Sequence, residues 1–244
     1  RDDVESRGLG DVYKRQDMGG KIRFNVAKFG AKVASQVSKF GFGSGNNLPG
    51  YVFYKIAGKE ALKDLAHEMS IGPILITGTN GKTTTTTLLI KLLSADTKIR
   101  KSFESNTIHA ITTGILKGDG DLGVFEYGIR NKSYGIPDTV QRLIDPVGVV
   151  YTTISREHSQ VAGVKNPFEE YVDAKSLLSQ GMTRGVVISN ADDPVTANIA
   201  CNKRNDLHVN FYGLAIDSIN DIFESDSPCL LYTSPSPRDS TSSR

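Results

Sequence analysis

Apolar and polar residues alternate along this chain with two different periods, which predict strands and helices in turn. Short apolar runs typical of buried strands are separated by segments in which apolar residues recur every three or four positions, as on one face of a helix. The expected strands are residues 74–76, 98–103, 122–126, 147–154, 185–189 and 207–212. The repeated order of strand and helix predicts an α/β fold, with a doubly wound, mostly parallel sheet.

Residues 25–40 have the pattern of a basic amphipathic helix, with lysine and polar residues opposite an apolar face. The apolar positions are Val26, Phe29, Val33, Val37 and Phe40. One interpretation, which we favour, packs this face on the domain and leaves the lysines solvated. The other places the helix on a membrane surface, where it would keep the protein near a lipid-linked substrate. Residues 41–50 are expected to form a loop and residues 61–69 a short helix.

The most informative stretch is TGTNGKTTTTT, residues 77–87, which follows an apolar strand and opens a helix. Gly78 and Gly81 let the backbone approach an anion closely, the helix presents unpaired N–H groups, and Lys82 adds a positive charge. We therefore expect the loop to hold nucleotide phosphates, with the Thr83 hydroxyl placed to reach Mg²⁺. The first glycine of the general loop G-x-x-x-x-G-K-[ST] is missing, so an ordinary turn is the alternative. Five consecutive threonines, which are poor helix formers, argue against that alternative.

The TGTNGKT loop strongly resembles the ATP-binding loop of the Mur ligase family, whose members form amide bonds in ATP-driven reactions. Further blocks resemble family motifs in the expected order: FEYG at 125–128, REH at 156–158, and DAK at 173–175 with NADDP at 190–194. The resemblance covers about residues 77–194 and implies the fold of the family's central ATP-binding domain. It also implies a nucleotide site made by Gly78, Thr79, Asn80, Gly81, Lys82, Thr83, Thr84 and Asn190.

Glu126 ends a predicted strand, and in open α/β sheets the ligand crevice lies beyond the carboxyl ends of the strands. A carboxylate there could take a Mg²⁺ that bridges nucleotide phosphates, and the resemblance gives Glu126 this role together with Thr83. The resemblance further implies that His158 and Lys175 hold a second Mg²⁺, with Lys175 carbamylated. With Lys82, these two are the expected catalytic residues. The alternatives are a solvated Glu126, a structural His158 and a surface Lys175.

Carbamylation of Lys175 requires a neutral amine, which only about one free lysine in two thousand provides at pH 7. The site must therefore lower the pKa of this lysine or trap the product with metal. The chain also departs from the family pattern N-x-x-x-D-H-L-D around the histidine, because Glu157 replaces the aspartate. Asn106, after the second strand, resembles a family asparagine that faces substrate or nucleotide, but a helix cap explains it equally well.

The composition favours an ordinary globular protein. The chain has 244 residues, 38% of them hydrophobic and 23% charged, which suits one or two domains. The formal net charge of +2, without a basic stripe interleaved with aromatic residues, gives no sign of nucleic-acid binding. No apolar run is long enough to span a membrane, and two cysteines provide no disulfide framework. The expected location is the cytoplasm.

Both ends of the chain look foreign to the protein. DVYKRQ at 11–16 and CLLYTS at 229–234 are what one DNA sequence encodes in opposite orientations, and that DNA resembles a transposon end used to build sequencing libraries. We therefore expect residues 1–16 and 229–244 to be adapter sequence, which has no part in fold or function.

The rest of the chain is expected to comprise a helical extension over residues 17–70 and a central ATP-binding domain over residues 71–228. In Mur ligases a separate C-terminal domain closes over the nucleotide and helps to position the amine. That domain is expected to be missing here, so the chain should bind ATP without completing amide synthesis.

The expected function is that of an ATP-dependent ligase that joins a carboxylate to an amine through an acyl phosphate, in the synthesis of pseudomurein or peptidoglycan precursors. ATP and Mg²⁺ would be its cofactors, and a small-molecule or lipid-linked peptide precursor and an amino acid its partners. Other ligases remain open: an amidating ligase-like subunit acting on lipid II, or a relative of folylpolyglutamate synthase. A P-loop module that binds ATP without ligase chemistry belongs to a different class. Phosphate release that depends on both a carboxylate and an amine distinguishes a ligase from such a module.

Overall fold

The computed structural model describes residues 2–39, 47–157, 165–202 and 207–214, and a six-stranded sheet lies at its centre. The strand order is β2-β3-β1-β4-β5-β6, and every neighbouring pair is parallel. The bounds are β1 Gly72–Thr77, β2 Ile99–Ser102, β3 Leu122–Glu126, β4 Gly148–Tyr151, β5 Val186–Asn190 and β6 His208–Tyr212. The predicted α/β fold with a doubly wound parallel sheet is therefore confirmed.

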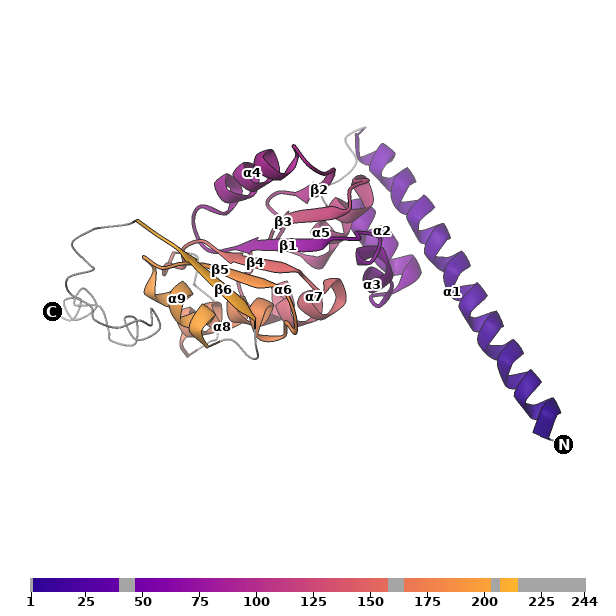
Figure 1. Cartoon of the computed structure of the whole chain (residues 1–244). Helices are drawn as coiled ribbons and strands as arrows, with labels where there is room; N and C mark the ends of the chain where they lie inside the picture. Colours follow the sequence, from indigo (N-terminus) through magenta and orange to yellow (C-terminus); the bar gives the residue numbers. More distant parts are fainter. Residues whose placement is uncertain (1, 40–46, 158–164, 203–206, 215–244) are drawn as a thin grey trace.

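Helices cover both faces of the sheet, but unequally (Figure 1). On one face α4, Lys82–Leu93, packs Ile90 into a small core with Ile76 and Val124 of the sheet. The larger core lies on the other face, where neighbouring side chains such as Leu75 point because successive residues of a strand alternate between faces. The helices of that side are α5 Ile108–Lys117, α7 Pro137–Ile144, α8 Pro167–Gln180 and α9 Pro194–Cys201, with the short α6 Lys132–Gly135 between β3 and α7.

The register brings the functional loops to one edge of the sheet. Ile76, near the end of β1, lies opposite Glu126 of β3 on one side and Val150 of β4 on the other. Because the strands are parallel, the loops that follow β1, β3 and β4 leave the sheet side by side. This is the point where the strand order changes direction, at which ligands bind in open α/β sheets.

The N-terminal helix is longer than predicted and presents a different face to the domain. Helix α1, Asp2–Lys39, runs along one side of the domain, and its N-terminal end projects away from it (Figure 1). Ala27 and Ala31 are buried in the core. The prediction that the large apolar residues pack on the domain is wrong: Val26, Phe29, Val33 and Val37 are exposed, and Phe40 lies outside the described residues. Among the described helices, none is both long and apolar enough to cross a bilayer.

Small residues explain this choice of face, because they let α1 approach α2, Leu48–Ala57, closely. A Cβ added to Gly30 would lie 3.1 Å from Ile56 Cδ1, which leaves little room for a larger side chain there. Phe24 then packs edge-on against Phe53, with ring centroids 5.6 Å apart. Helix α2 begins within the predicted loop of residues 41–50, since Pro49 suits the first turn of a helix. The following α3, Ala61–Ala66, is shorter than the helix predicted there.

Candidate nucleotide and metal site

The loop predicted to bind phosphate connects β1 to α4 at the centre of the sheet. Gly81 precedes the first turn of α4 with φ 84°, and Gly78 has φ 151°, a range that favours glycine. A Cβ on Gly78 would lie only 2.0 Å from Thr152 Oγ1, so a side chain has no room there. The N–H groups of the first turn of a helix have no partner within the helix, and such groups can bind an anion.

The end of β4 holds this loop in place. The Thr79 amide donates to the Thr153 carbonyl at 2.5 Å, and Asn80 forms an isolated antiparallel bridge with Thr153. The Thr152 hydroxyl donates to the Asn80 carbonyl at 2.7 Å. The Thr79 hydroxyl lies 3.0 Å from the Tyr171 hydroxyl of α8. The loop is therefore held by hydrogen bonds to two elements, the segment after β4 and helix α8. The sequence did not indicate the roles of Thr152 and of the Tyr171 hydroxyl, because neither residue type has a distinctive signal at such a position.

Lys82, the first residue of α4, folds back over the loop. Its Nζ donates to the Thr79 carbonyl at 2.6 Å. Burial lowers the pKa of Lys82, and the negative charge of Glu126 acts in the opposite direction. In this position, against the loop backbone and beside the first turn of α4, the Lys82 ammonium can contact a bound phosphate.

Thr83 and Glu126, both predicted to hold Mg²⁺, meet in the structure although they are 43 positions apart. The Thr83 hydroxyl donates to Glu126 Oε2 at 2.9 Å, and Glu126, the last residue of β3, is only 4% exposed. Hydroxyl and carboxylate oxygens are hard ligands of the kind that Mg²⁺ takes, usually together with phosphate oxygens and water. Within the described residues no group of three or more His, Cys, Asp or Glu side chains could hold a metal by itself. These two oxygens therefore fit a Mg²⁺ that arrives with a nucleotide rather than one that is caged by protein ligands.

Lys175 lies in the middle of α8 and is completely buried. Its Nζ donates to the carbonyls of Ile129 at 3.0 Å and Gly78 at 3.2 Å, and it lies 4.4 Å from the centre of the Tyr171 ring. Burial, reinforced by the positive charge of Lys82, lowers the pKa of Lys175 to about 7. The contact with the Gly78 carbonyl places Lys175 beside the glycine loop, and the alternative of a surface lysine is wrong.

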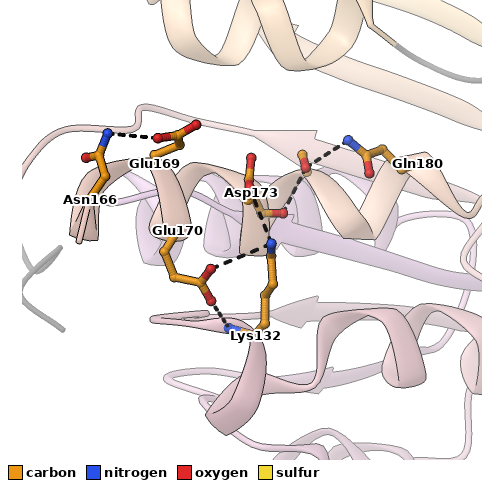
Figure 2. Close-up of polar contacts among 7 residues, drawn as sticks. Lys132, Asn166, Glu169, Glu170, Asp173 and Gln180 are labelled. Carbon is orange, nitrogen blue, oxygen red and sulfur yellow. Dashed lines mark hydrogen bonds and ion pairs between the residues drawn. The ribbon is translucent and has the colours of Figure 1, made fainter. Parts of the chain in front are cut away.

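Polar contacts join Lys132, the first residue of α6, to side chains of α8 (Figure 2). Lys132 lies 3.6 Å from Glu170 and 3.3 Å from Asp173, and its backbone amide donates to Glu170 at 3.3 Å. At the start of α8 the Asn166 amide group donates to Glu169 at 2.8 Å. The cluster joins α6 to α8 over the turn that contains Lys175.

The remaining predicted site residues within the described part of the chain lie around this centre. Asn190 ends β5, and its amide group is 3.5 Å from the Thr153 hydroxyl, so it borders the β4 end of the site rather than the loop itself. Thr84 is exposed on the first turn of α4. Asn106 lies beside Gly128, because a Cβ on that glycine would be 2.2 Å from Asn106 Oδ1. His158 lies outside the described residues.

Asp193, within the NADDP block, is a further buried acid near the site. Its carboxylate accepts from the Ile154 amide at 2.6 Å and from the Val195 amide at 2.9 Å, so it joins the end of β4 to the start of α9. Burial raises its pKa, and the backbone amides act against that change. Its contacts are those of a helix cap.

Comparison of the sequence with known proteins shows the family to which the chain belongs. The family model described as Mur ligase middle domain matches residues 76–228, more than half of the chain. A UDP-N-acetylmuramoyl-tripeptide–D-alanyl-D-alanine ligase of Bacillus subtilis is 30% identical over 146 residues, which cover 57% of this chain and 31% of that protein. The enzyme of the same description from Borreliella burgdorferi is 36% identical over 100 residues, 39% of this chain and 21% of that protein. The chain thus spans about a third or less of the length of these relatives.

Solved structures share the fold. A crystal structure of MurF from Acinetobacter baumannii superposes with a TM-score of 0.53 at 18% identity, over 69% of this chain and 35% of that one. A second structure from that organism, described as a UDP-N-acetylmuramoylalanyl-D-glutamyl-2,6-diaminopimelate–D-alanyl-D-alanyl ligase, gives a TM-score of 0.51 at 20% identity, over 66% of this chain and 35% of that one. At this identity the likeness concerns the arrangement of the sheet and its helices.

Proposed function

Because this chain belongs to the Mur ligase family, we propose that it carries the ATP site of a ligase that joins a carboxylate to an amine. The observation that supports this most directly is the meeting of Thr83 and Glu126, 2.9 Å apart, beside Lys82 on the glycine loop. A phosphate loop alone would suit any nucleotide-binding protein. A buried carboxylate that reaches the loop from a neighbouring strand can hold the Mg²⁺ of a bound nucleotide, and the family of the chain supports an acid as the acceptor of the phosphoryl group.

In the proposed reaction the γ-phosphate of ATP passes to a substrate carboxylate, which gives an acyl phosphate. The amine then attacks the acyl carbon, the amide bond forms and inorganic phosphate leaves. Lys82 and the N–H groups of the loop would stabilise the negative charge that moves between the two acceptors. Thr83 and Glu126 would hold Mg²⁺, which screens the charge of the β- and γ-phosphates.

We propose that Lys175 is carbamylated in the active protein. A pKa of about 7 leaves roughly half of this amine neutral at neutral pH, compared with about one in two thousand for a free lysine. Reaction of the neutral amine with CO₂ would form a bond from Nζ to carbon and release one proton, so that the neutral amine becomes an anion next to Lys82. The carbamate could then serve a second Mg²⁺, a role that the REH motif suggests His158 would share.

The acceptor is proposed to be a peptide-bearing cell-wall precursor, and the amine an amino acid or dipeptide. The curated relatives supply the most specific candidates, since they are described as joining D-alanyl-D-alanine to a UDP-N-acetylmuramoyl-tripeptide. A lipid-linked precursor is the second form in which such a peptide could reach the site. The two forms can be distinguished by offering each of them with the same amine.

Two measurements test the proposal. Titration of the full chain with Mg-ATP in a calorimeter should show binding, and Lys82→Ala should weaken it by at least about 100-fold, because a charge-assisted contact to phosphate is lost. Lys91→Ala, an exposed lysine on the same helix, is the matched control and should bind as the unaltered protein does. Equal affinity in the Lys82→Ala variant would rule out the phosphate role of the loop.

The ligase step needs a second assay, of phosphate release. Turnover of this chain alone is expected to be low, and the phosphate that it does release from ATP should require both a peptide carboxylate and an amine. Hydroxylamine should trap the acyl group as a hydroxamate. Release that continues at the same rate without an acceptor would instead indicate an ATPase module without ligase chemistry.

A further inference from the structure

Helix α1 exposes a row of large apolar side chains that the nucleotide site does not use. Ile22, Val26, Phe29, Val33 and Val37 are between 44% and 69% exposed. They recur every three or four residues, so they form one stripe along the helix, about 22 Å long at 1.5 Å per residue. We call this set of five side chains the apolar stripe. Contiguous exposed apolar surface of this kind marks an interaction site.

The stripe is not a consequence of loose packing, because the other face of α1 is firmly attached. Ala27 and Ala31 are at most 1% exposed, and the Arg23 guanidinium donates to the Ile56 carbonyl of α2. Lys28 pairs with Glu68 at 2.6 Å. The helix is therefore held in one orientation, with its large apolar residues facing away from the domain.

The segment that carries the stripe has charged residues of one sign only. Residues 18–59, which include the described part of α1 that carries the stripe and all of α2, contain seven Lys and Arg and no Asp or Glu. The whole chain, in contrast, has 29 basic and 27 acidic residues. Lys21, Lys28 and Lys32 recur at intervals of seven and four along one border of the helix, so they lie in a line beside the stripe.

A cleft adjoins this border, between α1 and the C-terminal end of α5. Its volume is about 1030 Å³, and Phe29 of the stripe contributes to its wall. Four of its lining residues are cationic, Lys28, Lys32, Arg100 and Lys117, against two acidic ones, Glu68 and Asp119. The apolar stripe thus lies next to a hollow whose walls carry a net positive charge.

From this arrangement we propose that α1 docks the protein on an anionic lipid bilayer. The apolar stripe would enter the boundary between head groups and acyl chains, and the basic border with its cleft would contact anionic head groups. A second copy of this chain fits less well, because pairing two stripes would bring two rows of lysines together. The partner that fits the basic border and the apolar stripe together has a negatively charged surface above an apolar layer. An anionic lipid bilayer has both.

Vesicle flotation with the full chain tests the proposal. The protein should float with vesicles that contain phosphatidylglycerol, bind pure phosphatidylcholine vesicles weakly, and be released by raised salt. The triple variant Val26→Ser, Phe29→Ser, Val33→Ser should lower the partition coefficient by at least about tenfold, since several buried CH₂ groups are lost. Lys32→Gln should lower it by about fivefold on anionic vesicles and leave the weak neutral binding unchanged.

A matched control uses exposed apolar residues elsewhere. Leu88→Ser with Leu92→Ser, on α4, removes two side chains that are 58% and 64% exposed and should leave vesicle binding unchanged. Thermal melting of each variant verifies that it is folded, and Mg-ATP titration remains a separate readout. Equal binding to neutral and anionic vesicles, or an unaffected triple variant, would overturn the proposal. So would light scattering that shows a dimer which the triple variant loses, with no vesicle binding, because the stripe would then pair two copies of the chain.

Discussion

Helices α8 and α1 depart from the usual distribution of side chains in opposite ways. Helix α8 buries a lysine completely, whereas α1 leaves five large apolar side chains in contact with solvent. The two departures differ in cost, since a buried charge loses its hydration and an exposed apolar residue merely fails to gain by burial. The costly departure lies beside the proposed nucleotide site, and the inexpensive one lies on the outside of the molecule. Such departures indicate function most strongly where their cost is highest.

The largest expected effect is on stability after Lys175→Met. The pKa of Lys175 is lowered to about 7, whereas an unfolded lysine titrates near 10.4. Between these values the unfolded chain binds a proton that the folded protein lacks, so the free energy of unfolding of the unaltered protein rises with pH, by up to about 1.4 kcal/mol per unit. Below pH 7 the cost of burying the lysine is present in full. The variant should therefore be more stable by about 2–4 kcal/mol at pH 7, with a smaller advantage at pH 9.

Denaturation by guanidinium in bicarbonate-free buffer measures this difference at the two pH values. Lys91→Met, an exposed lysine of α4, is the control and should change stability by the same small amount at both. A Lys175→Met advantage that does not shrink toward pH 9 would contradict a lowered pKa of Lys175.

The next effect concerns the buried side of α1. Ala31→Leu should destabilise the protein by about 1–3 kcal/mol, because added methyl groups have no room between α1 and its neighbours. Lys32→Leu, one position further along on the exposed side, should cost much less. Urea denaturation of the two variants compares them directly. Equal losses would mean that α1 does not pack through its small residues.

A smaller effect is expected from Lys132→Ala, at the cluster over α8. Lys132 is 42% exposed in its ion pairs with Glu170 and Asp173, so its removal should reduce stability by less than about 1 kcal/mol. If this cluster positions the Ile129 carbonyl against Lys175, the rate of ATP-dependent phosphate release should fall more, expressed as a free energy, than the free energy of unfolding does. A phosphate-release assay and urea denaturation measure the two changes. Lys98→Ala, which removes a more exposed pair with Asp119, is the control for a simple loss of charge.

The smallest effect is expected from Phe29→Ser on the apolar stripe. Phe29 is 69% exposed, so the free energy of unfolding should change by less than about 0.5 kcal/mol. A thermal melt measures it. A loss of several kcal/mol would show that another part of the protein covers this face.

The sheet could be predicted because its strands are apolar runs between clear glycine and polar breaks. The glycine loop between β1 and α4 could be predicted because Gly78, Gly81 and Lys82 each have a physical reason to stand where they do. The meeting of Thr83 with Glu126 was implied by the family resemblance, and it agrees with the position of both residues at the carboxyl edge of the sheet. These features depend on local sequence and on one rule about parallel strands.

Other features depend on tertiary packing, which the one-dimensional pattern does not contain. The hydrophobic pattern of α1 identified a helix but placed the wrong face inward, because close approach to α2 favours Ala27 and Ala31 over larger residues. The start of α2 was predicted to be a loop, since glycine and proline are typical of turns. In the structure Gly50 lies so close to the backbone of α5 that a side chain would have no room there. The environment of Lys175 is not contained in its local sequence, because its hydrogen-bond partners come from two segments distant from α8, residues 77–78 and Ile129.

The bridge between Asn80 and Thr153 makes the glycine loop a short continuation of the sheet. A loop ordered in this way does not have to fold around its ligand, so little conformational entropy remains to be lost when a nucleotide arrives. Association should then be limited by diffusion and charge rather than by loop closure, and discrimination between nucleotides should appear in how fast they leave. In hydrogen exchange the Thr79 amide, bonded to the Thr153 carbonyl, should be protected even before any nucleotide is added.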